Sequence, residues 1–92
     1  MHEYFSKTND LAIPLKYQEF YELRLEDSEV ESPGFLVRQT HFSWCELERQ
    51  MTFDQTLYER YHTLKAAKAR YAQRRQLLFE SGFIHSDRDP MG

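Results

Sequence analysis

Residues 52–83 read TFDQTLYERYHTLKAAKARYAQRRQLLFESGF, and this stretch decides the predicted fold. Thr52 and Gln55 form a capping box, in which two side chains satisfy free N–H groups at the start of a helix. Most of the residues that follow are strong helix formers. At 100° per residue, the apolar side chains fall within one stripe about 80° wide. We therefore predict one long C-terminal helix over residues 53–81. The stripe consists of Phe53, Leu57, Tyr61, Leu64, Tyr71, Leu78 and Phe79.

The end of this predicted helix is marked by Gly82, because glycine readily takes the left-handed conformation that closes a helix. Phe83 can then pack back on Leu78, as in a Schellman motif. The polar residues 85–92, which include Pro90, are expected to form a flexible tail. Residues 1–12 are expected to form a second one.

A second capping box, Ser43 with Glu46, precedes the long helix. Trp44, Leu47 and Met51 would share one helical face. The pattern predicts a shorter helix over residues 44–51, with a break at Thr52.

The N-terminal third alternates apolar and polar residues between positions 15 and 26, which favours a strand. Its Glu, Gln, Lys and Leu content leaves a helix as the alternative. Ser32, Pro33 and Gly34 indicate a turn, and residues 35–42 indicate a second strand. The predicted fold is thus mainly α with a short N-terminal β-hairpin, an α+β arrangement in a single small domain over residues 1–92. An all-α bundle or helical hairpin is the alternative.

The composition indicates which classes of protein the chain can belong to. Of the 92 residues, 40% are hydrophobic and 29% are charged, a balance typical of a globular chain with a small core. The single cysteine, Cys45, excludes an internal disulfide and a thiol-rich metal site, and it favours a reducing compartment. No signal peptide or run of about twenty apolar residues is found. We expect a cytoplasmic protein.

Two pairs of residues have spacings that occur in enzymes. His41 lies one helical turn before Cys45, as a general base might lie before a nucleophile. Glu59 and His62 have the Glu-x-x-His spacing of carboxylate-bridged metal bundles. The first pair lacks a third orienting group and the second pair occurs only once. We therefore predict no catalytic residues, cofactor or metal, and no enzymatic activity.

The charges are distributed unevenly around a net charge of −3. Residues 19–31 carry six acids against one base, whereas residues 65–75 carry five bases and no acid. The two blocks could neutralise each other within the fold, between copies, or against outside partners.

A helix of nearly thirty residues would be about 40 Å long, longer than the rest of so small a chain can cover. We therefore expect a non-enzymatic interaction or regulatory protein whose helix binds another protein or a second copy. The alternative is a nucleic-acid-binding module that uses the basic segment of residues 65–75. The expected partner-binding residues are Lys65, Lys68, Arg70, Tyr71, Arg74, Arg75 and Leu78.

Overall fold

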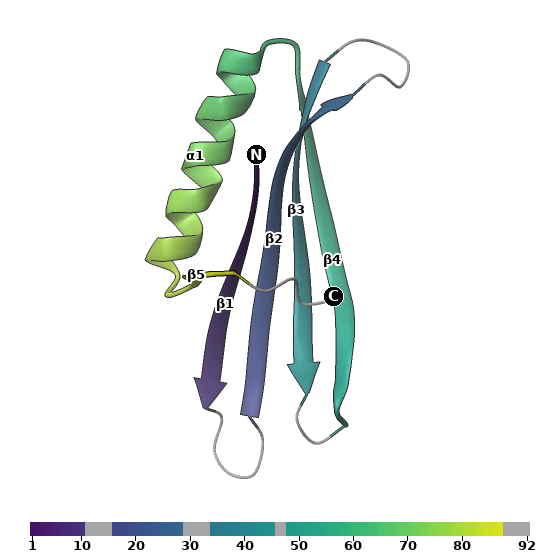
Figure 1. Ribbon diagram of the computed structural model, residues 1–92, viewed down its shortest axis with the longest axis vertical. Helices are drawn as coiled ribbons and strands as arrows, with labels where there is room; N and C mark the ends of the chain where they lie inside the picture. The colour runs from purple at the N-terminus through teal and green to yellow at the C-terminus, as the bar shows by residue number, and fades with distance from the viewer. Residues whose placement is uncertain (11–15, 29–33, 46–47, 88–92) are drawn as a thin grey trace.

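The computed structural model describes residues 1–10, 16–28, 34–45 and 48–87. The described chain forms an antiparallel five-stranded sheet with one helix on one of its faces (Figure 1). In chain order the elements are β1 (His2–Asp10), β2 (Lys16–Ser28), β3 (Gly34–Cys45), β4 (Gln50–Tyr61), α1 (Leu64–Glu80) and β5 (Ile84–Ser86).

The order of strands across the sheet is β4-β3-β2-β1-β5. The first four strands follow one another as a meander, and β5 returns after the helix to pair with three residues of β1. β5 thus protects part of one edge of the sheet. The other edge is β4, with which only β3 pairs among the described strands.

The register between β3 and β4 shifts once. His41 lies opposite Gln55 while the next residue, Phe42, lies opposite Phe53, so Asp54 is an extra residue on β4. Such a bulge bends the strand and changes which face the following side chains occupy. On either side of it, residues opposite each other share one face of the sheet.

The core lies between the sheet and α1. It consists of Phe5, Leu23, Leu25, Val37, Ala67, Tyr71, Leu78 and Phe83. Leu23 and Leu25 occupy alternate positions in β2, and the helix members recur at spacings of four and seven. Tyr71, with no exposed surface, is the largest fully buried side chain.

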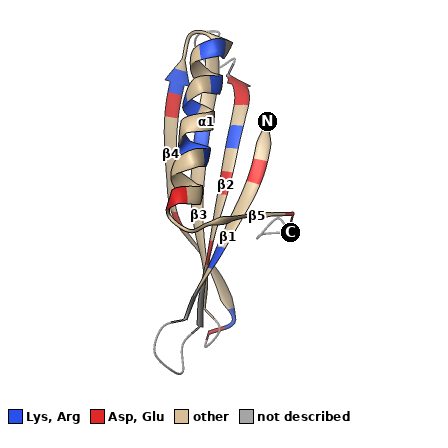
Figure 2. Cartoon of the chain, turned by 90° about the vertical axis from the view of Figure 1, so that its left-hand side faces the viewer, with Lys and Arg blue, Asp and Glu red and all other residues tan. Residues whose placement is uncertain are grey.

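The sheet is longer than the helix that covers it. α1 has 17 residues and β2 has 13, which at 1.5 Å and 3.3 Å per residue correspond to about 26 Å and 43 Å. Figures 1 and 2 show the strands continuing well past the end of α1, toward the C-terminal ends of β1 and β3. No helix in the described chain is long and apolar enough to cross a membrane.

The prediction of a mainly α fold is wrong, and so is its all-α alternative. Nor is the chain built on a long amphipathic helix. Residues 53–61 of that predicted helix belong to β4, and α1 begins only after Thr63, whose Oγ1 accepts a hydrogen bond from the N–H of Ala66 at 3.2 Å. Leu57 and Tyr61 share a face in either conformation, because a spacing of four fits both a strand and a helix. These residues form a strand because β4 pairs with β3 at eleven positions.

The predicted helix over residues 44–51 is wrong for the same reason. Trp44 and Cys45 end β3, while Gln50 and Met51 begin β4; residues 46–47 lie outside the described residues. The Ser43 hydroxyl does not cap a helix but donates to Oδ2 of Asp54 at 2.5 Å. Residues His2–Asp10, in the segment expected to be an N-terminal tail, pair with β2 as β1.

Two local predictions are confirmed. The strands expected within residues 15–26 and 35–42 are present as β2 and β3 and are paired antiparallel. The helix ends as predicted, because Gly82 has φ of +93° and the N–H of Phe83 donates to the carbonyl of Leu78 at 3.0 Å.

Candidate protein-binding surface

The residues predicted to bind a partner have three different environments. Tyr71 and Leu78 lie in the core beneath α1. Lys65 and Lys68 are exposed near the start of the helix. Arg70, Arg74 and Arg75 contact carboxylates of the sheet. The side chains that would have formed one interface are therefore not gathered on one outward surface.

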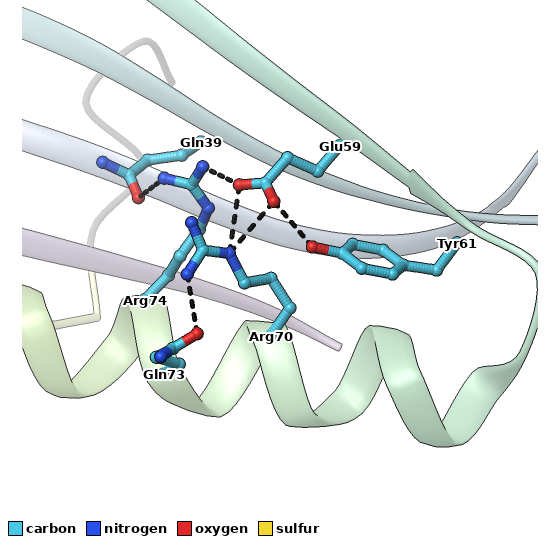
Figure 3. Close-up of polar contacts among 6 residues, drawn as sticks. All are labelled: Gln39, Glu59, Tyr61, Arg70, Gln73 and Arg74. Atoms are coloured by element: carbon cyan, nitrogen blue, oxygen red, sulfur yellow. Dashed lines mark hydrogen bonds and ion pairs between the residues drawn. The ribbon is translucent and has the colours of Figure 1, made fainter.

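Glu59 of β4 holds one flank of the helix (Figure 3). Its carboxylate accepts from Nε of Arg70 at 3.0 Å, from Nη2 of Arg74, and from the Tyr61 hydroxyl at 2.6 Å. Arg74 also donates to Gln39 of β3 at 3.2 Å. Two arginines of the basic segment therefore join α1 to β3 and β4.

Glu3 of β1 holds the other flank. It accepts from the Tyr71 hydroxyl at 2.8 Å and from Nε of Arg75 at 2.9 Å, and His85 Nε2 lies 3.4 Å away. Burial acts to raise the pKa of Glu3, but hydrogen bonds from Arg75 and Tyr71 outweigh it and the pKa is lowered. Burial, reinforced by the bond to Glu3, raises the pKa of Tyr71.

The acids that neutralise the basic segment are thus Glu59 and Glu3. They do not come from the acidic block of residues 19–31. Within that block, Glu22 contacts Arg38 at 3.1 Å on the sheet face opposite α1, and Glu26 contacts Arg24 at 3.6 Å. The ion pairs of the described residues thus do not join the two charge blocks to each other.

The sheet face opposite α1 carries a row of phenylalanines across three strands. Phe20 of β2 lies opposite Phe42 of β3, which in turn lies opposite Phe53 of β4. The rings of Phe42 and Phe53 meet edge to face, with centroids 5.8 Å apart. Trp44 and Met51, the next opposed pair of that face, extend the row toward the β3–β4 turn. We call Phe20, Phe42, Trp44, Met51 and Phe53 the open-face patch.

Among the described elements no helix lies over the open-face patch, because α1 packs on the other face (Figure 2). Phe42 at its centre is nevertheless only 8% exposed, since neighbouring side chains surround it, whereas Phe53 at its border is 58% exposed. Toward the N-terminus of β1 the patch gives way to ion pairs among His2, Glu22 and Arg38. An apolar aromatic centre with a charged rim is typical of protein-binding surfaces.

The opposite face of the same sheet extension carries a polar cluster. The ring nitrogens of His41 each lie 3.1 Å from a carboxylate oxygen, Nε2 from Glu19 and Nδ1 from Asp54. The bulge makes the second contact possible, because it places Asp54 beside His41. The Tyr21 ring stacks on His41 with centroids 4.6 Å apart. Burial, together with Glu19 and Asp54, raises the pKa of Tyr21.

Neither sequence pair with an enzyme-like spacing forms a site. Because β3 is extended, His41 and Cys45 are separated by about 13 Å along the strand, too far for proton transfer. Glu59 is engaged by Arg70 and Arg74, and His62 is exposed beyond the end of β4. Within the described residues no group of three or more His, Cys, Asp or Glu side chains could hold a metal ion.

Comparison of the chain with protein-family models, with curated proteins and with solved structures finds no significant match.

The open-face patch is the feature that sequence reasoning missed. A helical period assigns Trp44 and Met51 to a short helix and Phe53 to the long one, so that only Phe42 was expected in a strand. A strand period puts Phe42 and Trp44 on one face, and the pairing of β3 with β4 then brings Met51 and Phe53 opposite them. The available signal was this pair of aromatic-rich alternations around a short polar segment.

Proposed function

We propose that this chain is a non-enzymatic protein-binding module of the cytoplasm, and that its partner protein docks on the open-face patch. The observation that carries the proposal is the row of Phe20, Phe42 and Phe53 on a face that no described element covers. A single small helix protects one face of the core. On the second face Phe53 remains 58% exposed, and a partner protein would bury it.

The partner expected from this surface presents apolar side chains at its centre. Phe53 is the anchor on this chain, because it is large, more than half exposed, and adjacent to a buried aromatic neighbour. Arg38 and Glu22 form a charged rim that would orient the partner more than it would add affinity.

Nucleic-acid binding through residues 65–75 has less support. Arg70, Arg74 and Arg75 would have to leave Glu59 and Glu3 before they could contact phosphates. The net charge of −3 also opposes association with a polyanion.

The test is a capture experiment with the tagged chain in lysate of the cells that produce it. Phe53→Lys places a charge at the most exposed aromatic residue of the proposed contact. Leu77→Lys is the matched control, because Leu77 is a similarly exposed apolar residue, 50% exposed, but lies on α1. We expect the wild type and Leu77→Lys to capture one protein partner in stoichiometric amount. We expect Phe53→Lys to capture at least tenfold less of it, which corresponds to about 1.4 kcal/mol in binding free energy.

Two outcomes contradict the proposal. One is capture of the same proteins in equal amounts by Phe53→Lys and the wild type. The other is a bound fraction that consists of nucleic acid and is released by raising salt from 50 to 200 mM, as phosphate contacts would be. Circular dichroism of both variants confirms that the sheet is intact before the comparison is made.

A further inference from the structure

The outer edge of β4 is a second unsatisfied surface, distinct from the open-face patch. β4 is twelve residues long and only β3 pairs with it among the described strands. Within the described residues, the backbone N–H and C=O groups of its outer edge therefore have no strand partner. Such edges are commonly protected by lysine, proline or a covering element. β4 contains neither residue.

Apolar side chains border this edge on both faces. Tyr58, on the open face, is 62% exposed, and Leu57, on the helix face, is 41% exposed. A strand added beside β4 would cover both at once, which a partner docked on one face could not do. The combination favours strand addition as the mode of contact.

The bulge limits where a regular strand can be added. β4 pairs with β3 without irregularity from Gln55 to Tyr61, and the bulge at Asp54 interrupts the strand before it. The regular segment is thus residues 55–61, and its middle residue is Tyr58. An antiparallel partner that uses the whole segment is centred on Tyr58.

We propose that this partner is a second copy of the chain, paired β4 to β4 about a twofold axis at Tyr58. When a twofold axis places two copies of one strand edge side by side and antiparallel, the N–H groups of each copy face the C=O groups of the other. The register places Glu59 opposite Leu57 of the second copy, and Arg60 opposite Thr56. No like charges oppose one another, and the two exposed Tyr58 rings meet on the open face.

The helices leave room for this arrangement. α1 contacts β2, β3 and β4 and so lies near the middle of these three strands, over β3. Both helices would then lie on the same face, about 14 Å apart at three strand spacings of about 4.8 Å, more than the 8–10 Å of packed helices. A groove of about 730 Å³ lies on this flank between Tyr61 and the helix. Its other lining residues are Ala66, Ala69, Arg70, Ala72 and Gln73.

A disulfide cross-link tests the register. In a background of Cys45→Ser, the variant Tyr58→Cys places two thiols opposite each other across the axis, with Cα atoms about 5 Å apart, within disulfide range. Arg60→Cys in the same background is the matched control, because the two copies of residue 60 would be offset by about 13 Å along the strands. We expect Tyr58→Cys to form covalent dimer under mild oxidation at least about tenfold faster than Arg60→Cys.

Sedimentation equilibrium of the unmodified chain completes the test. We expect a dimer that Tyr58→Lys dissociates and that Leu77→Lys leaves intact. The proposal is overturned if the chain remains a monomer up to about 100 µM, because the dissociation constant would then be too large for a specific interface. It is also overturned by a dimer in which both cysteine variants cross-link at equal rates. Phe53→Lys lies outside residues 55–61, so loss of partner capture with the dimer retained, or the reverse, separates this proposal from the function proposed above.

Discussion

Glu3 and Glu59 hold α1 on the sheet from opposite flanks through hydrogen bonds and ion pairs to residues of the helix. Each accepts from arginine and from a tyrosine hydroxyl. A partly buried carboxylate with charge-assisted partners contributes more to stability than a surface ion pair does. The basic residues of the helix are therefore structural where they meet these acids.

Stability below neutral pH should depend on Glu3. Its pKa is lowered in the folded chain from an ordinary value of 4.5, so its contribution is present above pH 4.5 and is lost as the pH falls through the folded pKa. We expect Glu3→Gln to lower the free energy of unfolding by about 1 kcal/mol at pH 7, and by less at pH 3, below the ordinary pKa. Urea unfolding at both pH values measures the difference.

The exposed Glu48 provides the control for this experiment. Glu48→Gln should change the free energy of unfolding little at either pH. A loss for Glu3→Gln that is equal at pH 7 and pH 3 would mean that the Glu3 charge does not stabilise the fold.

At the element scale, the sequence predicted elements whose signals are local. The end of α1 depends on Gly82, and the predicted strands depend on alternation in β2 and on the apolar residues of β3; both predictions are confirmed. β4 was not predicted, because Leu57 and Tyr61 are four residues apart, a spacing that fits both a helix and a strand. The contacts that favour the strand come from β3. The candidate surface was missed with it, since the open-face patch exists only once β3 and β4 are in register.

Gly82, at the end of α1, allows a second prediction about stability. Gly82 has φ of +93°, and a Cβ there would lie 3.5 Å from the Lys7 side chain, which is ordinary contact. The penalty of Gly82→Ala is therefore conformational, and we expect a loss of about 1 kcal/mol in the free energy of unfolding. Gly82→Asn should lose less, because asparagine tolerates the left-handed conformation. Equal losses in thermal unfolding would place the cause in packing instead.

At the scale of the whole molecule, a 17-residue helix covers only part of one face of a longer sheet. The uncovered part presents the aromatic open-face patch on one side and the polar cluster of His41 on the other. The free edge of β4 borders both. Association is thus expected on surfaces of the sheet, and the helix serves mainly to complete the core.

Trp44, the single tryptophan of the chain, lies in the open-face patch and tests the central claim directly. Labelled with 5-fluorotryptophan, the chain should give one ¹⁹F resonance. We predict that adding the captured partner shifts this resonance in the wild type and in Leu77→Lys, and leaves it in place in Phe53→Lys. A resonance that stays in place while the wild type is saturated with partner would show that binding occurs elsewhere and would contradict the account.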